Sequence, residues 1–252
     1  MGTPVIEVAG LSKSFGKRGE QEVIQRLDLT VDRGEFVTVV GASGCGKSTL
    51  LNIIAGLDKP TQGNVVVTGK VALMFQDATL LPWLSAIQNI QLALRLQGVQ
   101  EPTRTTRAQE LLNIVRLGDA MHKRPHELSG GMKQRVALAR CLAQDASIVL
   151  MDEPLGALDA MTRDHLHDEI EALSRDQGLT VVFVTHNMRE AIRLGDRVIL
   201  MGSNPGRVVH EERVDLTRPR LMDSIDIATR AARLTMHLKN QQADRVLSGA
   251  DS

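Results

Sequence analysis

The sequence predicts an α/β protein with a mostly parallel sheet and a helical segment inserted into it. Two short runs, residues 147–151 and 180–185, are continuously apolar, which is typical of strands buried on both faces of a parallel sheet. A glycine-rich loop at residues 41–48 joins an apolar run to a helical pattern. Between residues 82 and about 118 helical periodicity prevails, which indicates an inserted helical lobe.

The first elements are expected to be strands. Short β-branched runs occupy residues 5–8, 27–31 and 35–40, and polar breaks at 17–20 and 32–34 separate them. A helix should follow the glycine-rich loop and end at Gly56 in the left-handed conformation that terminates many helices. Its apolar face consists of Leu50, Leu51, Ile53 and Ile54.

The later elements are mostly helical. Within the inserted lobe, the clearest helical face ends before Gly118 and consists of Ala108, Leu111, Leu112 and Val115. A charge-rich helix at residues 163–175 should cross over between the two buried strands. After a turn at residues 204–206 the chain should return through Val208 and Val209, and an amphipathic helix should carry Ile227, Ala231, Leu234 and Leu238.

Composition limits the classes of function. The 252 residues, 42% of them hydrophobic, suffice for a sizeable core without disulfides. Lys plus Arg and Asp plus Glu both number 30, so the chain lacks the basic excess of a non-specific nucleic-acid binder, and we expect no nucleic-acid partner. The two cysteines, Cys45 and Cys141, form neither a disulfide framework nor a metal-ligand spacing, which favours a reducing compartment such as the cytoplasm.

Export and membrane signals are not evident in the sequence. The first residues lack the charged and apolar regions of a signal peptide, and Ile6 stands where a myristoylation motif needs Ser or Thr. Apolar runs such as 36–40 and 181–184 fall far short of the roughly 18 residues that suggest a membrane-spanning helix. If this protein serves a membrane, we expect another chain to supply the membrane part.

The glycine-rich loop matches the P-loop pattern G-x-x-x-x-G-K-[ST] and lies between a strand and a helix, the context that supports this motif. Chance matches rarely satisfy both conditions, so a merely flexible turn is the weaker interpretation. Backbone N–H groups and the helix N-terminus would surround phosphates, Lys47 would reach the β- and γ-phosphates, and Ser48 would ligate Mg²⁺. The expected nucleotide-binding residues are Gly41, Ala42, Ser43, Gly44, Cys45, Gly46, Lys47, Ser48 and Thr49.

A second candidate phosphate binder lies at residues 128–135, with the sequence LSGGMKQR. Ser129 can cap the following helix and present its hydroxyl and backbone N–H groups to an anion. The segment resembles L-S-G-G-x-x-x-R, the signature motif of ABC ATPases, in which Ser129, Gly130 and Gly131 would contact nucleotide. An ordinary loop-to-helix junction explains the Ser and Gly residues but not the motifs that accompany them. The apolar face of this helix consists of Met132, Val136, Ala139 and Ala143.

Further motifs extend this resemblance over nearly the whole chain. Residues 148–153 resemble the Walker B strand, where Asp152 would hold Mg²⁺ and Glu153 would polarise the attacking water. Gln76 matches the Q-loop glutamine that senses Mg²⁺ and water. Asp159 ends a segment that resembles the D-loop, and His186 matches the switch histidine at the γ-phosphate. By itself, His186 would be read as a satisfied surface histidine.

Three residues near these motifs need separate interpretations. Phe15 falls where the family places an aromatic residue that stacks on adenine, although it could instead pack in the core. Cys45, beside Lys47 and a helix N-terminus, should have a favoured thiolate and be vulnerable to reagents without being catalytic. Cys141 lies in the apolar register of the helix after the signature motif and should be a buried small hydrophobe.

The resemblance implies the ABC ATPase fold, with an N-terminal antiparallel β subdomain beside the mostly parallel core. A nucleotide-binding core would comprise residues 1–76 and 144–210, the inserted helical lobe residues 77–143, and a C-terminal extension residues 211–252. The resemblance also implies ATP hydrolysis with Mg²⁺ in a sandwich dimer, most simply a homodimer. In that dimer the P-loop of one copy would face Ser129 and Gly131 of the other.

In function, the resemblance implies a peripheral ATPase on the cytoplasmic face of the inner membrane. It would act with separate integral-membrane permease subunits and indirectly with a substrate-binding protein. Residues 75–83 and 204–208 look like the nitrate, sulfonate and taurine group of bacterial importers, with aliphatic sulfonate import as the best match. The alternatives are a soluble non-transport ABC ATPase and the ATPase of an exporter, but the sequence shows no second ATPase domain, long coiled coil or fused membrane domain.

Trp83 is the only tryptophan of the chain and has two interpretations. Its side chain could belong to the core of the helical lobe, where large aromatics usually find partly buried positions. Alternatively, residues 80–83 could line the groove that receives a short cytoplasmic helix of the permease. Replacement by Ala should separate the two, because it would reduce stability in the first case and permease association in the second.

Overall fold

The computed structural model describes residues 2–16, 21–203 and 205–247, with side chains described as far as residue 240. The strands are β1 (Pro4–Phe15), β2 (Gln21–Asp32), β3 (Phe36–Gly41), β4 (Gln62–Val67), β5 (Val71–Met74), β6 (Ile148–Asp152), β7 (Thr180–Thr185), β8 (Arg197–Gly202) and β9 (Arg207–Arg213). The helices are α1 (Lys47–Ile54), α2 (Ala86–Leu96), α3 (Thr103–Ile114), α4 (Gly130–Leu142), α5 (Ala160–Asp176), α6 (Met188–Leu194) and α7 (Ile225–Leu247).

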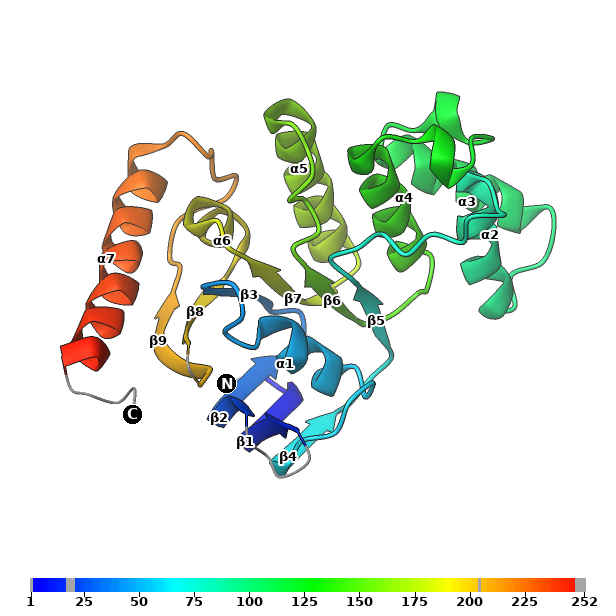
Figure 1. Ribbon diagram of the computed structural model, residues 1–252. Coiled ribbons are helices and arrows are strands. Elements are labelled where there is room, and N and C mark those ends of the chain that lie inside the picture. The colour runs from blue at the N-terminus through cyan, green and yellow to red at the C-terminus, as the bar shows by residue number, and fades with distance from the viewer. Residues whose placement is uncertain (1, 17–20, 204, 248–252) are drawn as a thin grey trace.

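Two sheets organise the molecule (Figure 1). The larger has the order β5-β6-β7-β3-β8-β9, and its first five strands are parallel while β9 is antiparallel to β8. The smaller is antiparallel, with the order β2-β1-β4. The predicted fold class, a mostly parallel α/β core beside an N-terminal antiparallel sheet, is confirmed.

Side chains of the parallel strands alternate between the two faces of the large sheet, as the pleat requires. On β6, Ile148 and Leu150 join a cluster with α1 and the smaller sheet, whereas Val149 and Met151 join the cluster of α2 to α5. Helix α1 is therefore packed between the two sheets, and the longer helices cover the opposite face (Figure 1). Burial on both faces explains why these strands are continuously apolar in sequence.

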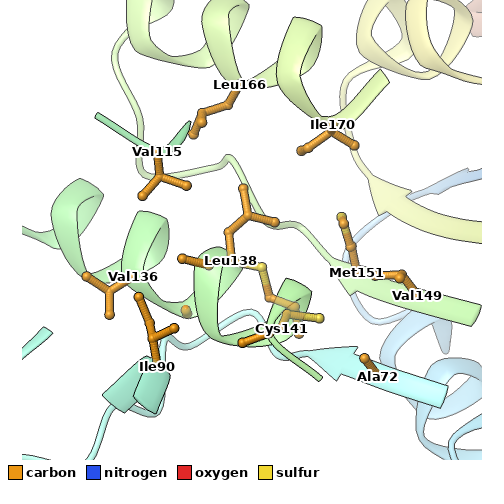
Figure 2. Packing of buried hydrophobic residues seen from close by; sticks show 14 of the residues in the cluster. Ala72, Ile90, Val115, Val136, Leu138, Cys141, Val149, Met151, Leu166 and Ile170 are labelled. Carbon is orange, nitrogen blue, oxygen red and sulfur yellow. The ribbon is translucent and has the colours of Figure 1, made fainter. Parts of the chain in front are cut away.

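Helices α2, α3 and α4 gather at one end of the large sheet and correspond to the predicted helical lobe (Figure 1). Figure 2 shows Ile90 of α2 and Val136 of α4 packed together, while Leu138 and Cys141 of α4 lie toward Met151 of β6. The apolar contacts of the lobe are thus continuous with those of the sheet. Helix α4 forms the junction between them.

The C-terminal extension is fastened to the core by apolar and polar contacts. Ile227, Ala231 and Leu234 of α7 are buried against α6 and β8, which confirms the predicted amphipathic helix. The guanidinium group of Arg220 is buried and donates to backbone carbonyl oxygens of Ile192, Arg193, Gly195, Val214 and Leu216. Desolvation lowers the pKa of this guanidinium to about 10.

The element boundaries differ from the sequence expectations in places. The long strands β1 and β2 extend well beyond residues 5–8 and 27–31, and β4, β5 and β8 were not predicted. The expected helical stretch 82–118 contains the two helices α2 and α3. Gly56 has φ 73°, as expected of a left-handed helix terminus. The polar break at 17–20 and Asn204 of the predicted turn lie outside the described residues.

Candidate functional site

One group of the predicted site residues meets where four neighbouring parallel strands end. In the order β5, β6, β7 and β3, the segments that leave these strands carry Gln76, Glu153, His186 and the P-loop. Paired residues near these ends, such as Asp152 with Val184 and Val40 with Thr185, show that the strands finish close to one level. Ligands of open parallel sheets bind in the crevice outside the carboxyl ends of the strands.

The P-loop wraps around the amino group of Lys47. This group donates to the carbonyl oxygens of Gly41 and Ala42, each at 2.9 Å, and only 6% of the residue is exposed. Helix α1 begins after Gly46, whose φ of 94° is left-handed, so a residue without Cβ is favoured there. Ser43, Gly44 and Ser48 are exposed on the outer surface of the loop.

The structure corrects the expectation for Cys45. Its thiol is 1% exposed and packs beneath the loop, with the Lys47 amino group 3.9 Å from its sulfur. Burial raises the pKa of the Cys45 thiol, and this outweighs the lowering effect of Lys47 and the nearby N–H groups. Cys45 is therefore not a favoured thiolate open to reagents. The interpretation of Cys141 is confirmed, because the thiol is buried and its pKa is raised to about 12 by desolvation.

Asp152 and Ser48 place two oxygen groups together at the end of β6. The Ser48 hydroxyl hydrogen-bonds the Asp152 carboxylate, which is only 7% exposed. Burial raises the pKa of Asp152 and the adjacent Glu153 carboxylate raises it further, while the hydrogen bond from Ser48 and the charge of Lys47 lower it. Hard oxygen donors of this kind suit Mg²⁺, which usually keeps several waters and takes few protein ligands beside phosphate oxygens.

Glu153 and His186 form a polar pair across two strand ends. The Oε2 atom of Glu153 lies 3.0 Å from Nδ1 of His186, whose side chain is 68% exposed. The backbone N–H of Glu153 donates to the carbonyl oxygen of Val184 at 3.0 Å, which holds the residue at β7. Its φ of 43° is left-handed, an uncommon conformation for a residue with a side chain. Such conformations cluster at functional sites.

A pocket of about 180 Å³ lies between the P-loop and Glu153. Gln76 and Glu153 share its wall with the P-loop, and Gln76 is exposed there. We define the Q-loop segment as residues 76–79 and the D-loop segment as residues 156–159. The residues that line this pocket are Val23, Ser43, Gly44, Gly46, Lys47, Ser48, Thr49, Gln76 and Glu153.

The signature residues do not belong to this pocket within the part of the chain that the structure describes. Ser129 caps α4 as expected, because its hydroxyl oxygen accepts the N–H of Met132 at 3.2 Å. A Cβ placed on Gly130 would meet no atom within 4 Å, so this helix start is open. Asp159 is exposed and caps α5 by accepting the N–H of Thr162 at 3.0 Å, which lowers the pKa of its carboxyl.

For two aromatic residues, the exposed fraction of the side chain decides between the two interpretations given above. Phe15 is 43% exposed at the end of β1, and the amino group of Lys13 lies 4.8 Å from its ring centroid. The core-packing interpretation of Phe15 is therefore wrong. Trp83 is 67% exposed, so its assignment to the core of the helical lobe is also wrong.

Several polar residues around the site were not predicted to contribute. Gln134 is buried on α4, and its side chain contacts both the Q-loop and D-loop segments. His167 of α5 is fully buried 2.7 Å from Glu190, and Glu190 also accepts from the hydroxyl of Thr185, directly before His186. The available signal was the spacing of Gln134 from Leu138 and Cys141, which puts this polar residue on a helical face with two apolar ones.

Known proteins that are similar to this chain belong to the family that its motifs indicate. The family model described as ABC transporter matches residues 24–156, more than half of the chain. The chain is 45% identical over 255 aligned positions to the aliphatic sulfonates import ATP-binding protein SsuB of Pseudomonas putida, covering 98% of this chain and 87% of that protein. It is 42% identical over 210 positions to the taurine import ATP-binding protein TauB of Burkholderia pseudomallei, covering 80% and 81%.

A solved structure agrees with this match. A dimeric ATP-binding cassette in a post-hydrolysis state, bound to ADP and Pi, aligns with a TM-score of 0.77 at 34% identity, covering 84% of this chain and 100% of that chain. Within the described residues, no helix is both long and apolar enough to cross a bilayer. These matches show that the chain belongs to the ABC transporter family, as an ATP-hydrolysing, ATP- and Mg²⁺-dependent subunit of the group that contains the sulfonate and taurine import proteins.

Proposed function

We propose that this chain drives import of a small oxidised sulfur or nitrogen anion, most simply an aliphatic sulfonate, through a separate permease. The observation that carries the proposal is the similarity to the SsuB protein, which spans nearly the whole of this chain. The similarity to a taurine import protein supports the same class of cargo. Cargo contacts would lie on other subunits, namely the permease and a substrate-binding protein.

At the site, we assign the chemistry to the residues that meet at the strand ends. Lys47 and the N–H groups of the P-loop bind the phosphates, and Phe15 stacks on adenine. Glu153 orients and polarises the attacking water, with His186 beside it at the γ-phosphate and Gln76 in the wall of the same pocket. Ser48 and Asp152 would hold Mg²⁺, which neutralises charge that develops on the phosphate oxygens.

Two copies would be needed for a complete site. The openness of the Ser129 helix start, away from the P-loop pocket of its own chain, supports a sandwich in which it binds the nucleotide held by a partner. Asp159 and the rest of the D-loop segment would lie at the same interface. Because phosphates shared between copies provide the attraction, the chain should be mostly monomeric without Mg²⁺ and ATP. Light scattering with and without nucleotide tests this.

The permease would dock beside the Q-loop segment, at the cytoplasmic face of the inner membrane. A groove of about 330 Å³ lies there between the core and the helical lobe, and Leu57 and Phe75 on its wall are exposed. Trp83 is not among the lining residues, but its exposed ring lies on the same connection between β5 and α2. Trp83→Ala should leave thermal stability nearly intact while weakening permease association.

Deletion of the gene tests the cargo. The deletion strain should fail to grow with an alkanesulfonate as sole sulfur source, because the permease would lose its ATP-driven closure, and should grow normally on sulfate. Growth on taurine and growth on nitrate as sole nitrogen source separate the other cargos of the group. Normal growth on alkanesulfonates, taurine and nitrate would reject the importer assignment as proposed.

A further inference from the structure

One side chain of α4 holds two loops of the site at once. Gln134 is 8% exposed, and its amide nitrogen donates to the carbonyl oxygen of Gln76 at 2.8 Å. Its amide oxygen accepts the backbone N–H of Ala157 at 3.4 Å. The orientation of the amide is fixed by these partners, because a carbonyl oxygen can only accept and a backbone N–H can only donate.

A second residue of α4 holds the other end of the Q-loop segment. The guanidinium of Arg140 donates to the carbonyl oxygens of Thr79 at 2.9 Å and Ala78 at 3.0 Å. Gln134 and Arg140 are roughly 9 Å apart along the helix axis, given a rise of about 1.5 Å per residue. The Q-loop segment is therefore fastened to α4 at both ends, so that it and the signature motif at the start of α4 move as one body.

The D-loop segment is held mainly from the other side. Arg163 of α5 donates to the carbonyl oxygens of Leu155 at 3.3 Å and Leu158 at 2.6 Å. The Cβ that an alanine would add at Gly131 lies 3.3 Å from the carbonyl oxygen of Ala157, so signature motif and D-loop segment approach closely. The bond between Gln134 and Ala157 thus joins the body that contains α4 to the body that contains α5.

We propose that Gln134 is a positioning residue for ATP hydrolysis. Its amide nitrogen places Gln76 against the P-loop pocket, and its amide oxygen sets the register between the signature helix and the D-loop segment. The proposal rests on the function proposed for Gln76 and Glu153. Without the amide, Gln76 and the D-loop segment are no longer hydrogen-bonded to the same side chain. Their relative position is then less well defined, and hydrolysis slows. ATP binding by the P-loop persists, because Lys47 and its loop make no contact with Gln134 among the described interactions.

Two substitutions test the two ends of the amide. Gln134→Met keeps the length of the side chain and removes both hydrogen bonds, and we expect kcat to fall about tenfold with the Kd for ATP within about twofold of wild type. Gln134→Glu keeps the acceptor for Ala157 but places a carboxylate oxygen against the Gln76 carbonyl oxygen. Gln109→Glu, the same exchange at an exposed position of α3, is the matched control and should change neither quantity.

The pH response of Gln134→Glu is the readout that a merely structural role would not give. Burial raises the pKa of a carboxyl group, so lowering the pH from about 8 to about 6 should protonate the introduced group. Its O–H can then donate to the Gln76 carbonyl oxygen, and kcat relative to wild type should rise. A Gln134→Glu deficit that is independent of pH, or no deficit, would overturn the proposal even if Gln134→Met does not fold.

A parallel Glu153→Gln variant separates this proposal from the proposed function. If Glu153→Gln abolishes hydrolysis while both Gln134 variants retain the wild-type kcat, the positioning role fails and the catalytic assignment stands. If Glu153→Gln hydrolyses ATP normally, the proposed site is wrong, and the role of Gln134 falls with it. Loss of hydrolysis in Glu153→Gln together with the pH-dependent deficit of Gln134→Glu supports both.

Discussion

The P-loop and the signature motif are both glycine-rich turns at helix starts, yet the chain builds them differently. At the P-loop, a Cβ on Gly46 would lie 2.9 Å from Ile24 and 3.2 Å from the carbonyl oxygen of Val23, so the loop is enclosed by its own chain where it enters α1, although Gly44 at its tip is open. At the signature motif, Gly130 has open space around it and only Gly131 approaches another segment, the D-loop segment. Ser129 provides a side-chain cap that α1 lacks.

This contrast indicates which half of the site is ordered before a partner arrives. The enclosed loop holds its cation, Lys47, in place by two carbonyl oxygens, so little ordering remains when phosphates bind. At the signature helix start, the Ser129 hydroxyl accepts an N–H of its own helix, and Ser129 and Gly130 remain exposed. We therefore expect substitutions at the first element to act within one copy, and those at the second to act only when two copies meet.

The largest effect should come from replacing Glu153, the acid beside the P-loop. Glu153→Gln preserves size and an acceptor for His186 but removes the carboxylate, so kcat should fall by about a hundredfold or more while ATP still binds. An ATP-bound dimer should then accumulate on size-exclusion chromatography. The exposed Glu110→Gln on α3 is the control, and normal turnover by Glu153→Gln would contradict the assignment.

Lys47→Ala should damage binding itself. Loss of a charge-assisted contact to the phosphates predicts an ATP affinity at least about tenfold weaker, measured on the monomer by calorimetry. The exposed Lys123→Ala removes an equal charge outside the site and should bind normally. Equal affinity before and after the Lys47 substitution would show that the enclosed loop is not the phosphate site.

Ser129→Ala should distinguish the role of the signature motif from that of the P-loop. The variant loses a helix cap, which costs about 1 kcal/mol, and Ser85→Ala at the start of α2 loses a comparable cap. Both should therefore unfold at slightly lower temperature and bind ATP normally as monomers. Only Ser129→Ala should also hydrolyse more slowly, by about tenfold, because its hydroxyl would face the partner's nucleotide. Equal hydrolysis by the two variants would argue against an intersubunit role.

The smallest effect concerns thiol labelling. Because Cys45 and Cys141 are buried and the pKa of each thiol is raised, maleimide should label the native protein slowly, with or without ATP. Both thiols should react rapidly in guanidinium chloride at the same pH. Fast labelling of native Cys45 that ATP suppresses would mean that the P-loop opens far more often than its packing suggests.

The parts of the fold that depend on local pattern were predictable. Runs 147–151 and 180–185 are apolar because both faces are covered, and the motif after each strand fixes where the strand ends. The long strand β1 was only partly predicted, since register shifts between Val8 and Leu11 and again near Lys13 interrupt the alternation of its side chains. A period-2 pattern broken by bulges does not reveal the whole strand.

At the site, the sequence did not predict which side chains are buried or which residues they hydrogen-bond. Cys45 lies in an apolar cluster built from distant segments, and Gly206, far away in sequence, passes so close that a Cβ there would lie 2.0 Å from the Cys45 carbonyl oxygen. Gln134 stands inside a motif that the sequence displays, but its partners are 58 and 23 residues away. Such contacts come from the packing of distant segments, which no local window of sequence contains.

The left-handed backbone of Glu153 has a consequence for any attempt to make this protein more thermostable. A conformation of that kind costs a side-chain-bearing residue on the order of 1–3 kcal/mol, and glycine adopts it without that penalty. In a laboratory selection that rewards heat resistance alone, Glu153→Gly should therefore be enriched, although the survivors would no longer turn over ATP. A screen for more heat-resistant variants therefore needs a measurement of ATP hydrolysis to remove this substitution.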